Sequence, residues 1–153
     1  MNQRISVRAI VNQDEKLLLV RRATGRESIL GLYELPGGRL SYGEQPEDAL
    51  RRYLHDDTGL HIGESKLFDV VTYIDHDDRD IQYAVITYMV TLAEGHHELR
   101  LGSNYDEYLW LPLLEIQQGS LTDLTQLLLG IMQQEKITDK KKKKVGITDD
   151  KIT

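Results

Sequence analysis

The most constraining feature of this sequence is a chain breaker followed at once by a helix-forming segment. Residues 35–38, Leu-Pro-Gly-Gly, interrupt any strand or helix, because proline lacks an amide donor and glycine is conformationally free. Pro46 then suits the first turn of a helix, apolar residues follow at helical spacing, and Gly59 suits the position just past its end. A helix between Pro46 and Gly59 is therefore expected soon after a tight turn.

Strand-forming segments flank this helix on both sides. Residues 5–11 alternate in polarity and residues 17–20 form a short apolar run, which together predict a hairpin. Residues 66–74 and 81–92 predict a second pair of strands, joined by the charged loop 75–80. The segment 81–92 is apolar at nearly every position, which indicates burial on both faces.

The remaining segments complete the arrangement. Residues 23–34 and 94–108 are polar and are expected to form loops, whereas Ser120–Gln134 predicts an amphipathic helix capped by Ser120 or Thr122. Strands and helices in this order predict an α/β (α+β) fold, in which helices cover both faces of a mixed sheet.

The end of the chain differs from the rest in composition and charge. Residues 137–153 contain a run of lysines and repeated Ile-Thr, which is typical of a disordered tail, so we expect one domain at 1–136 followed by this tail. The net charge is −6, and seven lysines against three aspartates give +4 over 136–153, which leaves −10 on the other 135 residues. Such an acidic body argues against nucleic-acid binding and requires cations at any phosphate site.

Several classes of protein are excluded by what the sequence lacks. There are no cysteines, which excludes disulfides, zinc thiolates and thiol nucleophiles. No apolar run reaches the roughly 18 residues that span a bilayer, and the first residues do not form a secretory signal. A cytoplasmic protein without a membrane partner is therefore expected.

Acidic side chains gather in and around the predicted helix. Asp56 and Asp57 lie side by side at its end, and Glu44, in the loop that enters it, can fold back toward the same face. Oxygen ligands of this kind suit Mg²⁺ or Mn²⁺ rather than zinc. The sequence therefore predicts a hard divalent cation beside this helix.

This region resembles the Nudix box, G-x5-E-x7-R-E-U-x-E-E-x-G-U, in which U is aliphatic. The positions that match its spacing are Gly38, Glu44, Arg52, Leu54, Gly59 and Leu60. The Leu-Pro-Gly-Gly lead-in and Trp-Leu-Pro at 110–112 are similar to segments of the same family, so that the resemblance covers most of residues 3–135. It implies the Nudix fold and a MutT-type, Mg²⁺-dependent hydrolase. Its substrate would be a nucleoside diphosphate derivative, either a nucleoside triphosphate, oxidised forms included, or a nucleotide sugar.

The box is degenerate at three positions. Tyr53 stands where the family has glutamate, and Asp56 and Asp57 stand where it has two further glutamates. A phenol is neutral at pH 7 and does not replace a carboxylate ligand, and each aspartate is shorter than glutamate by about 1.5 Å. The alternative to a hydrolase is therefore a Nudix-fold module that binds a nucleotide or a protein without cleaving it.

The resemblance assigns catalytic and metal-binding roles residue by residue. It implies a metal held by Glu44, Asp56, Asp57 and Glu98, with Arg52 orienting one of these carboxylates. The alternative for Arg52 is an ordinary surface ion pair with Asp48 or Asp56. For Glu98, within Gly-His-His-Glu at 95–98, the competitors are Asp106 and Glu107, and each of these acids also suits a solvated loop.

The resemblance also implies substrate contacts. Arg22 would contact phosphate, Tyr33 would stack on the base, and Gly37 and Gly38 would approach the substrate closely. The alternatives are a strand-end surface charge for Arg22 and a packing role for Tyr33. The expected partner is a small-molecule nucleotide, and a homodimer is a further expectation from the family.

Overall fold

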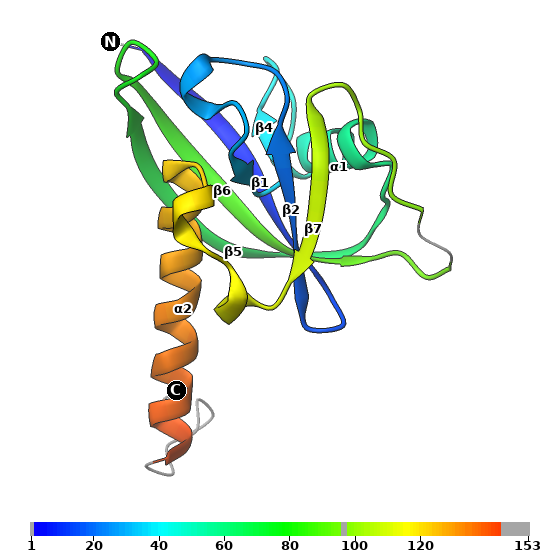
Figure 1. Ribbon diagram of the computed structural model, residues 1–153, viewed down its shortest axis with the longest axis vertical. Helices are drawn as coiled ribbons and strands as arrows, with labels where there is room; N and C mark the ends of the chain where they lie inside the picture. Colours follow the sequence, from blue (N-terminus) through cyan, green and yellow to red (C-terminus); the bar gives the residue numbers. More distant parts are fainter. Residues whose placement is uncertain (1, 96–97, 145–153) are drawn as a thin grey trace.

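The fold comes from a computed structural model, which describes residues 2–95 and 98–144 (Figure 1). In this part of the chain seven strands form one mixed sheet, accompanied by two α-helices and three 3₁₀ turns. The strands are β1 (Gln3–Gln13), β2 (Lys16–Arg22), β3 (Tyr33–Glu34), β4 (Gly37–Arg39), β5 (Ile62–Asp75), β6 (Ile81–Leu92) and β7 (Tyr105–Leu111). The helices are α1 (Pro46–Thr58) and α2 (Asp123–Lys144), and the turns are η1 (Glu27–Ile29), η2 (Leu113–Glu115) and η3 (Gln118–Ser120).

The sheet is mixed because its central strand pairs in both senses. The strand order is β3-β2-β1-β6-β5, with β4 added to β1 and β7 added to β2. β1 runs parallel to β6 and antiparallel to β2 and β4. The predicted hairpins are both present, and the predicted α+β fold class is confirmed.

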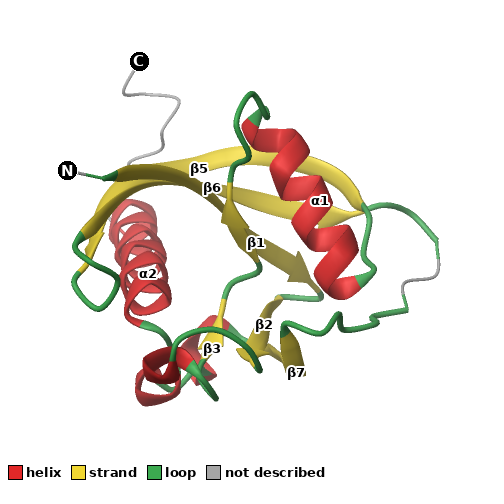
Figure 2. Ribbon diagram, turned by 90° about the horizontal axis from the view of Figure 1, so that it is seen from above, coloured by secondary structure: helices red, strands yellow, loops and turns green. Residues whose placement is uncertain are grey.

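The two helices lie on opposite faces of the sheet (Figure 2). Leu50 and Leu54 of α1 belong to one apolar core, and Leu128 and Leu129 of α2 belong to the other. Full burial of each leucine contributes about 1.5–3 kcal/mol. β6 lies between the two cores, so the predicted burial on both faces is confirmed for its middle part, where Val85 belongs to one core and Tyr88 to the other.

The ends of α1 agree with the sequence prediction. Pro46 occupies the first turn, where its missing amide hydrogen costs nothing. Gly59 adopts φ 72°, and its N–H donates to the carbonyl of His55 at 2.8 Å. This left-handed residue ends the helix and turns the chain toward β5.

The prediction for residues 94–108 was wrong at its C-terminal end, because β7 begins at Tyr105. The side chains of β7 alternate between solvent and the interior, and Asp106 and Tyr108 occupy exposed positions. The polar outer face hid the two-residue period of this strand. In the same way, the predicted loop 23–34 ends in β3, which pairs with β2.

α2 begins as predicted and ends later. Thr122 caps it, since the N–H of Thr125 donates to the Thr122 hydroxyl at 3.4 Å. The helix continues past Gln134 to Lys144, because its glutamine, glutamate and lysine residues favour helix and neither proline nor glycine interrupts the segment after Gly130. The first part of the predicted tail is thus helical, residues 145–153 lie outside the described residues, and the domain division at 136 stays a prediction.

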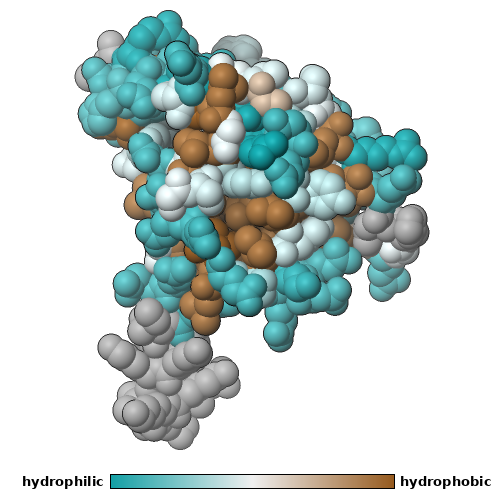
Figure 3. Space-filling view, viewed as in Figure 1, coloured by the Kyte–Doolittle hydropathy of each residue, from teal (hydrophilic) through white to brown (hydrophobic). Residues whose placement is uncertain are grey.

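The surface seen in Figure 3 is mostly hydrophilic, with separate apolar patches between charged regions. Within the described residues, no helix is both long enough and apolar enough to cross a bilayer.

Candidate active site

Side chains from the middle of α1 form hydrogen bonds with the segment that precedes the helix. We call this group the α1 clasp, which consists of Gly38, Arg39, Glu44, Arg52 and Tyr53. Arg52 donates to both carboxylate oxygens of Glu44, from Nε and Nη2, at 2.9 Å each. The N–H of Ser41 donates to the same carboxylate at 3.0 Å. The hydrogen bonds from Arg52 and then from Ser41 lower the pKa of Glu44 to about 2.

Tyr53 occupies the other side of the clasp. Its hydroxyl donates to the carbonyl of Arg39 at 2.8 Å, and the Arg52 guanidinium lies 4.4 Å from the centre of its ring. A Cβ atom on Gly38 would lie 2.7 Å from the Tyr53 hydroxyl oxygen and closer still to the ring. Gly38 is therefore required by the packing of Tyr53, whatever the substrate contacts.

Gly37 has a different packing reason. Its φ is 145°, and a Cβ atom there would lie 2.9 Å from Cα of Arg8 in the neighbouring strand. The close approach of β4 to β1 thus accounts for this glycine. The substrate contacts predicted for Gly37 and Gly38 stay predictions.

The opposite end of α1 presents a buried acid. Asp57 is 6% exposed, and Asn104 Nδ2 donates to its Oδ1 over a long 3.4 Å. Burial raises the pKa of Asp57, against the hydrogen bond from Asn104 and the positive charge of Arg22. The neighbouring carboxylate of Asp56 is exposed and lies 3.3 Å from Nδ1 of His55.

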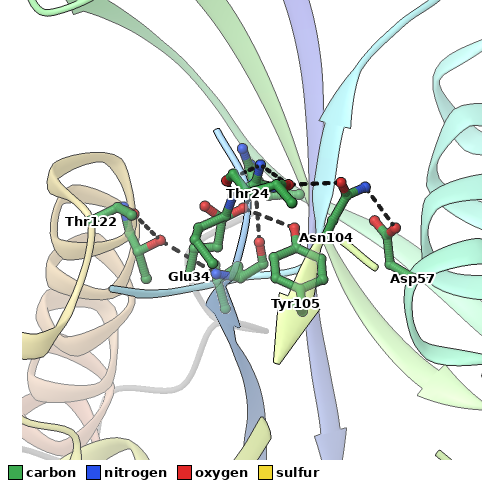
Figure 4. A network of polar contacts seen from close by, with 10 residues as sticks. Thr24, Glu34, Asp57, Asn104, Tyr105 and Thr122 are labelled. Atoms are coloured by element: carbon green, nitrogen blue, oxygen red, sulfur yellow. Dashed lines mark hydrogen bonds and ion pairs between the residues drawn. The ribbon is translucent and has the colours of Figure 1, made fainter. Parts of the chain in front are cut away.

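A chain of hydrogen bonds links this acid to the end of β2. The Thr24 hydroxyl donates to the side-chain oxygen of Asn104 at 2.9 Å, and Arg22 donates to the carbonyl of Thr24 at 2.8 Å (Figure 4). Arg22, Thr24, Asp57 and Asn104 form what we call the Asp57 site. It brings the arginine predicted to contact phosphate next to an acid predicted to bind metal.

A second polar group adjoins the Asp57 site. Arg22 lies 5.2 Å from the ring centre of Tyr105, whose hydroxyl donates to Glu34 at 3.0 Å. Glu34 also accepts from Arg8 at 2.7 Å. Burial raises the pKa of Tyr105, and the charge of Glu34 adds to this effect. Burial opposes the charge of Arg8, but the facing carboxylate of Glu34 outweighs it, so that the pKa of Arg8 is also raised.

Glu34 and Arg8 reach a cavity of about 210 Å³. The lining includes Ser6, Arg8, Arg26, Glu34, Gly38 and Tyr83. Within the described residues, the buried Ser6 hydroxyl and Arg8 Nε have no hydrogen-bond partner. The cavity therefore offers polar groups that a ligand could satisfy.

The sequence matches the NUDIX domain family over residues 2–129. The chain belongs to the Nudix family. The predicted family and fold are thus confirmed.

Relatives of known identity include the nucleoside triphosphatase NudI. The Escherichia coli protein is 25% identical over 117 residues, covering 72% of this chain and 83% of that protein. The Escherichia fergusonii protein is 24% identical over 139 residues, covering 86% and 97%.

Solved structures agree with this assignment. A MutT NUDIX hydrolase from Burkholderia pseudomallei superposes with a TM-score of 0.73 at 25% identity, covering 85% of this chain and 98% of that one. The NUDIX domain of Shewanella oneidensis NrtR, complexed with ADP ribose, has a TM-score of 0.70 at 22% identity and covers 88% and 89%. The second likeness shows the fold alone.

The Nudix box residues do not all meet in this structure. Arg52 contacts Glu44 and forms no ion pair with Asp48 or Asp56 among the described residues. Within residues 2–95 and 98–144, no three His, Asp or Glu side chains converge as a metal-binding group. The neighbouring acids Asp56 and Asp57 nevertheless suit Mg²⁺, which one or two carboxylates hold when phosphates and water complete the octahedron.

The loop acids proposed as the fourth Nudix ligand have other partners. Glu98 accepts from Arg100 at 3.0 Å, and Asp106 and Glu107 both lie 2.7 Å from Arg21. The backbone after Glu98 does cross the end of α1, because Gly102 N–H donates to the Asp57 carbonyl at 2.9 Å. The metal roles of these acids stay predictions.

Tyr33 packs against the core beneath α2, and burial, followed by a hydrogen bond with Glu107, raises its pKa. Glu34 and Asn104 were not among the predicted site residues. Arg8, a charged residue between Val7 and Ala9 in the predicted strand 5–11, was the available signal for a buried acid such as Glu34. Asn104 had no comparable signal, since it lies in a polar segment directly before a strand that the sequence did not reveal.

Proposed function

We propose that this protein hydrolyses a phosphoanhydride bond of a nucleoside diphosphate derivative, with nucleoside triphosphates as the first class to test. The observation that carries this proposal is the hydrogen-bond chain from Arg22 through Thr24 and Asn104 to Asp57. It joins a guanidinium, which suits phosphate, to a buried carboxylate, which suits a cation. Membership of the Nudix family and the relationship to NudI nucleoside triphosphatases support the reaction class.

The chain's own acids suit the divalent cation that Nudix hydrolases generally use. Asp56 and Asp57 are the residues that would hold Mg²⁺ or Mn²⁺, together with the phosphates of the nucleotide. Such a cation supplies charge neutralisation on the phosphates and a water of lowered pKa. In the overall reaction a water oxygen bonds to phosphorus, the bridging P–O bond breaks, the leaving phosphate keeps the bridging oxygen, and the protons of the water pass to the products and the solvent.

The cavity lined by Arg8 and Glu34 suits the remainder of the substrate. It adjoins the Asp57 site through Tyr105, which contacts both Glu34 and Arg22. The Shewanella oneidensis NUDIX domain complexed with ADP ribose makes nucleotide sugars a second class to test.

A second candidate is a nucleotide-binding module without catalysis, and Tyr53 favours it. Its ring fills the space over Gly38, and its hydroxyl is already bound to Arg39, so the family's carboxylate at this position has no substitute there. This candidate predicts nucleotide binding in calorimetry without product. It also predicts that Tyr53→Glu introduces turnover.

The deciding experiment measures phosphate and pyrophosphate release from a panel of nucleotides with Mg²⁺ and with Mn²⁺. The panel contains ordinary and oxidised nucleoside triphosphates, ADP ribose and other nucleotide sugars. We compare the wild type with Asp57→Asn and with the matched control Asp48→Asn, an exposed acid on the same helix. Turnover that is lost only in Asp57→Asn is the expected result. A folded wild type that binds nucleotide but releases no product contradicts a hydrolase and favours the binding module.

A further inference from the structure

Two histidines lie next to each other where α1 ends and β5 begins. The rings of His55 and His61 have centroids 5.2 Å apart and are tilted by 43° to each other. Both side chains are exposed to solvent, so their contact does not follow from burial in a core. The proposed hydrolase uses neither imidazole. The pair is therefore a separate feature of the molecule, with ring nitrogens open to a ligand.

The backbone holds both histidines in place. His55 lies in the last turn of α1, and its carbonyl accepts from the N–H of Gly59 at 2.8 Å. His61 comes directly before β5, and its carbonyl accepts at 2.9 Å from the N–H of Ala93, which directly follows β6. The left-handed Gly59 turns the chain back between the two histidines, which brings them into contact. The two rings thus stand on fixed elements, as a preorganised site requires.

The spacing of the rings fits a shared metal ion. A zinc ion holds imidazole nitrogens at about 2.0–2.1 Å in a tetrahedral arrangement, which places the centroids of two ligating rings about 5 Å apart. The observed 5.2 Å agrees with this separation, and the 43° tilt distinguishes the pair from parallel stacked rings. Rotation of an imidazole about its Cβ–Cγ bond is soft, so each exposed ring can aim one nitrogen at a common point.

A carboxylate supports one of the two rings. Asp56 Oδ1 lies 3.3 Å from Nδ1 of His55. A proton shared with this carboxylate on Nδ1 leaves the lone pair on Nε2, and metal-ligating histidines are commonly oriented by such a partner. A helix also carries partial negative charge at its C-terminus, where a cation is stabilised. The surroundings of the pair therefore favour a cation bound through Nε2 of His55.

We propose that His55 and His61 together bind one transition-metal ion, of the class of Zn²⁺, Ni²⁺ and Cu²⁺, with water completing its coordination. Imidazole nitrogen suits these ions, whereas Mg²⁺ prefers oxygen ligands. The site is therefore distinct from the magnesium site proposed at Asp56 and Asp57, although Asp56 adjoins both. With two protein ligands it has fewer than the three or four of catalytic and structural zinc centres. This agrees with the absence of a three-residue metal group within residues 2–95 and 98–144.

The first test is calorimetric titration of the full chain with Zn²⁺ and, separately, with Ni²⁺, without nucleotide. We expect the wild type to bind both ions. His55→Gln and His61→Gln should each weaken binding at least about 10-fold, because even a residue that only supports a metal ligand is worth that much. Both side chains are exposed, so the fold is preserved, which circular dichroism verifies. Since no turnover is measured, failure of this test is distinct from failure of the proposed hydrolase.

Two further variants make this test specific. His76→Gln removes an exposed imidazole that is likewise paired with a carboxylate, Asp80 at 2.7 Å, but that contacts no second imidazole among the described residues. This variant and Asp57→Asn should both retain Zn²⁺ binding. The proposal is overturned by a wild type that binds no Zn²⁺, by undiminished affinity in both His55→Gln and His61→Gln, or by an equal loss in His76→Gln. Loss of binding in Asp57→Asn alone would place the ion among the acids and would also overturn it.

A second test identifies the ligand atoms. Cu²⁺ bound to the full chain is studied by electron paramagnetic resonance, in which each coordinated imidazole nitrogen splits the signal further. We expect the splitting of two nitrogens in the wild type and of one nitrogen in His61→Gln. The same splitting in both proteins overturns the proposal.

Discussion

The two ends of α1 differ in how completely their acids are paired. At the α1 clasp, the Glu44 carboxylate receives two hydrogen bonds from Arg52 and one from the backbone of Ser41, all of 2.9–3.0 Å. At the Asp57 site, a more deeply buried carboxylate receives one bond of 3.4 Å from Asn104 among the described residues.

The pKa values of the two acids are shifted in opposite directions. The pKa of Glu44 is lowered to about 2 by its hydrogen bonds, whereas burial raises the pKa of Asp57. A cation at the clasp would have to displace Arg52 from an already satisfied acid. A cation at the Asp57 site would instead relieve a buried charge, so we infer that the clasp is scaffold and the opposite end of the helix carries the chemistry.

The largest effect that tests this division is expected from Asp57→Asn. Turnover should fall at least about 100-fold, because even a residue that only orients a metal ligand is worth up to about that much. The melting temperature at pH 7 should stay the same or rise, since the neutral amide removes the cost of a buried charge. Nucleotide hydrolysis and thermal unfolding of the same sample provide both readings.

The control for this variant is Glu44→Gln, which removes the charge at the other end of α1. It should lower stability more than Asp57→Asn does and should retain more of the turnover. If Glu44→Gln instead abolishes turnover and Asp57→Asn does not, the division between scaffold and chemistry is reversed.

The second effect concerns packing within the clasp. Gly38→Ala should destabilise the protein by about 1–3 kcal/mol, because its Cβ would overlap Tyr53. In the double variant Gly38→Ala/Tyr53→Ala this overlap is absent. The loss of stability in the double variant should therefore be smaller than the sum of the losses in the two single variants. Urea unfolding of the four proteins measures the coupling. Strictly additive losses would show that Gly38 is needed for a reason other than Tyr53.

Local sequence was sufficient to predict the α1 end of this site. Pro46, Gly59 and the helical spacing between them fixed a helix that places Asp56 and Asp57 together at its end, as found. The family resemblance implied that Arg52 orients one of the acids of the site without saying which, and the structure pairs it with Glu44. These features depend on neighbours close in the chain, which is why a sequence pattern predicts them.

The rest of the site depends on contacts between distant strands. Asn104 reaches Asp57 because the segment before β7 crosses the end of α1 and β7 pairs with β2. β7 has a charged outer face that hid its period, so this pairing could not be predicted. The sequence also predicted that Tyr53 removes a carboxylate, but not that its ring would fill the space above Gly38, which is a matter of side-chain packing.

A smaller effect is expected from Asn104→Ala. This variant removes a hydrogen bond to Asp57 and the link to Thr24, and turnover should fall about 10-fold, as for other residues that orient a metal ligand. The lost bond favoured the charged form, so the acid limb of the pH–rate profile should also move to higher pH. Asn12→Ala, at the exposed C-terminal end of β1, is the control and should change neither quantity. An unshifted profile would show that Asn104 does not act on Asp57.

The smallest effect is a pH dependence of stability whose sign differs between the two ends of α1. The unfolded chain protonates Glu44 near 4.5, whereas the folded protein does so only near 2. Protons therefore favour the unfolded state in this interval, and the stabilisation from Glu44 is present above pH 4.5 and lost as the pH falls toward 2. The stability difference between wild type and Glu44→Gln should shrink as the pH falls over that range.

For Asp57 the folded pKa lies above the ordinary 3.8, so the wild type should instead lose stability relative to Asp57→Asn as the pH rises through this region. Urea unfolding of the three proteins between about pH 3 and pH 7, which brackets the ordinary carboxylate pKa values, compares the two slopes. Slopes of the same sign would mean that the two acids are not held in opposite electrostatic states, and the contrast between clasp and Asp57 site would then have no physical basis.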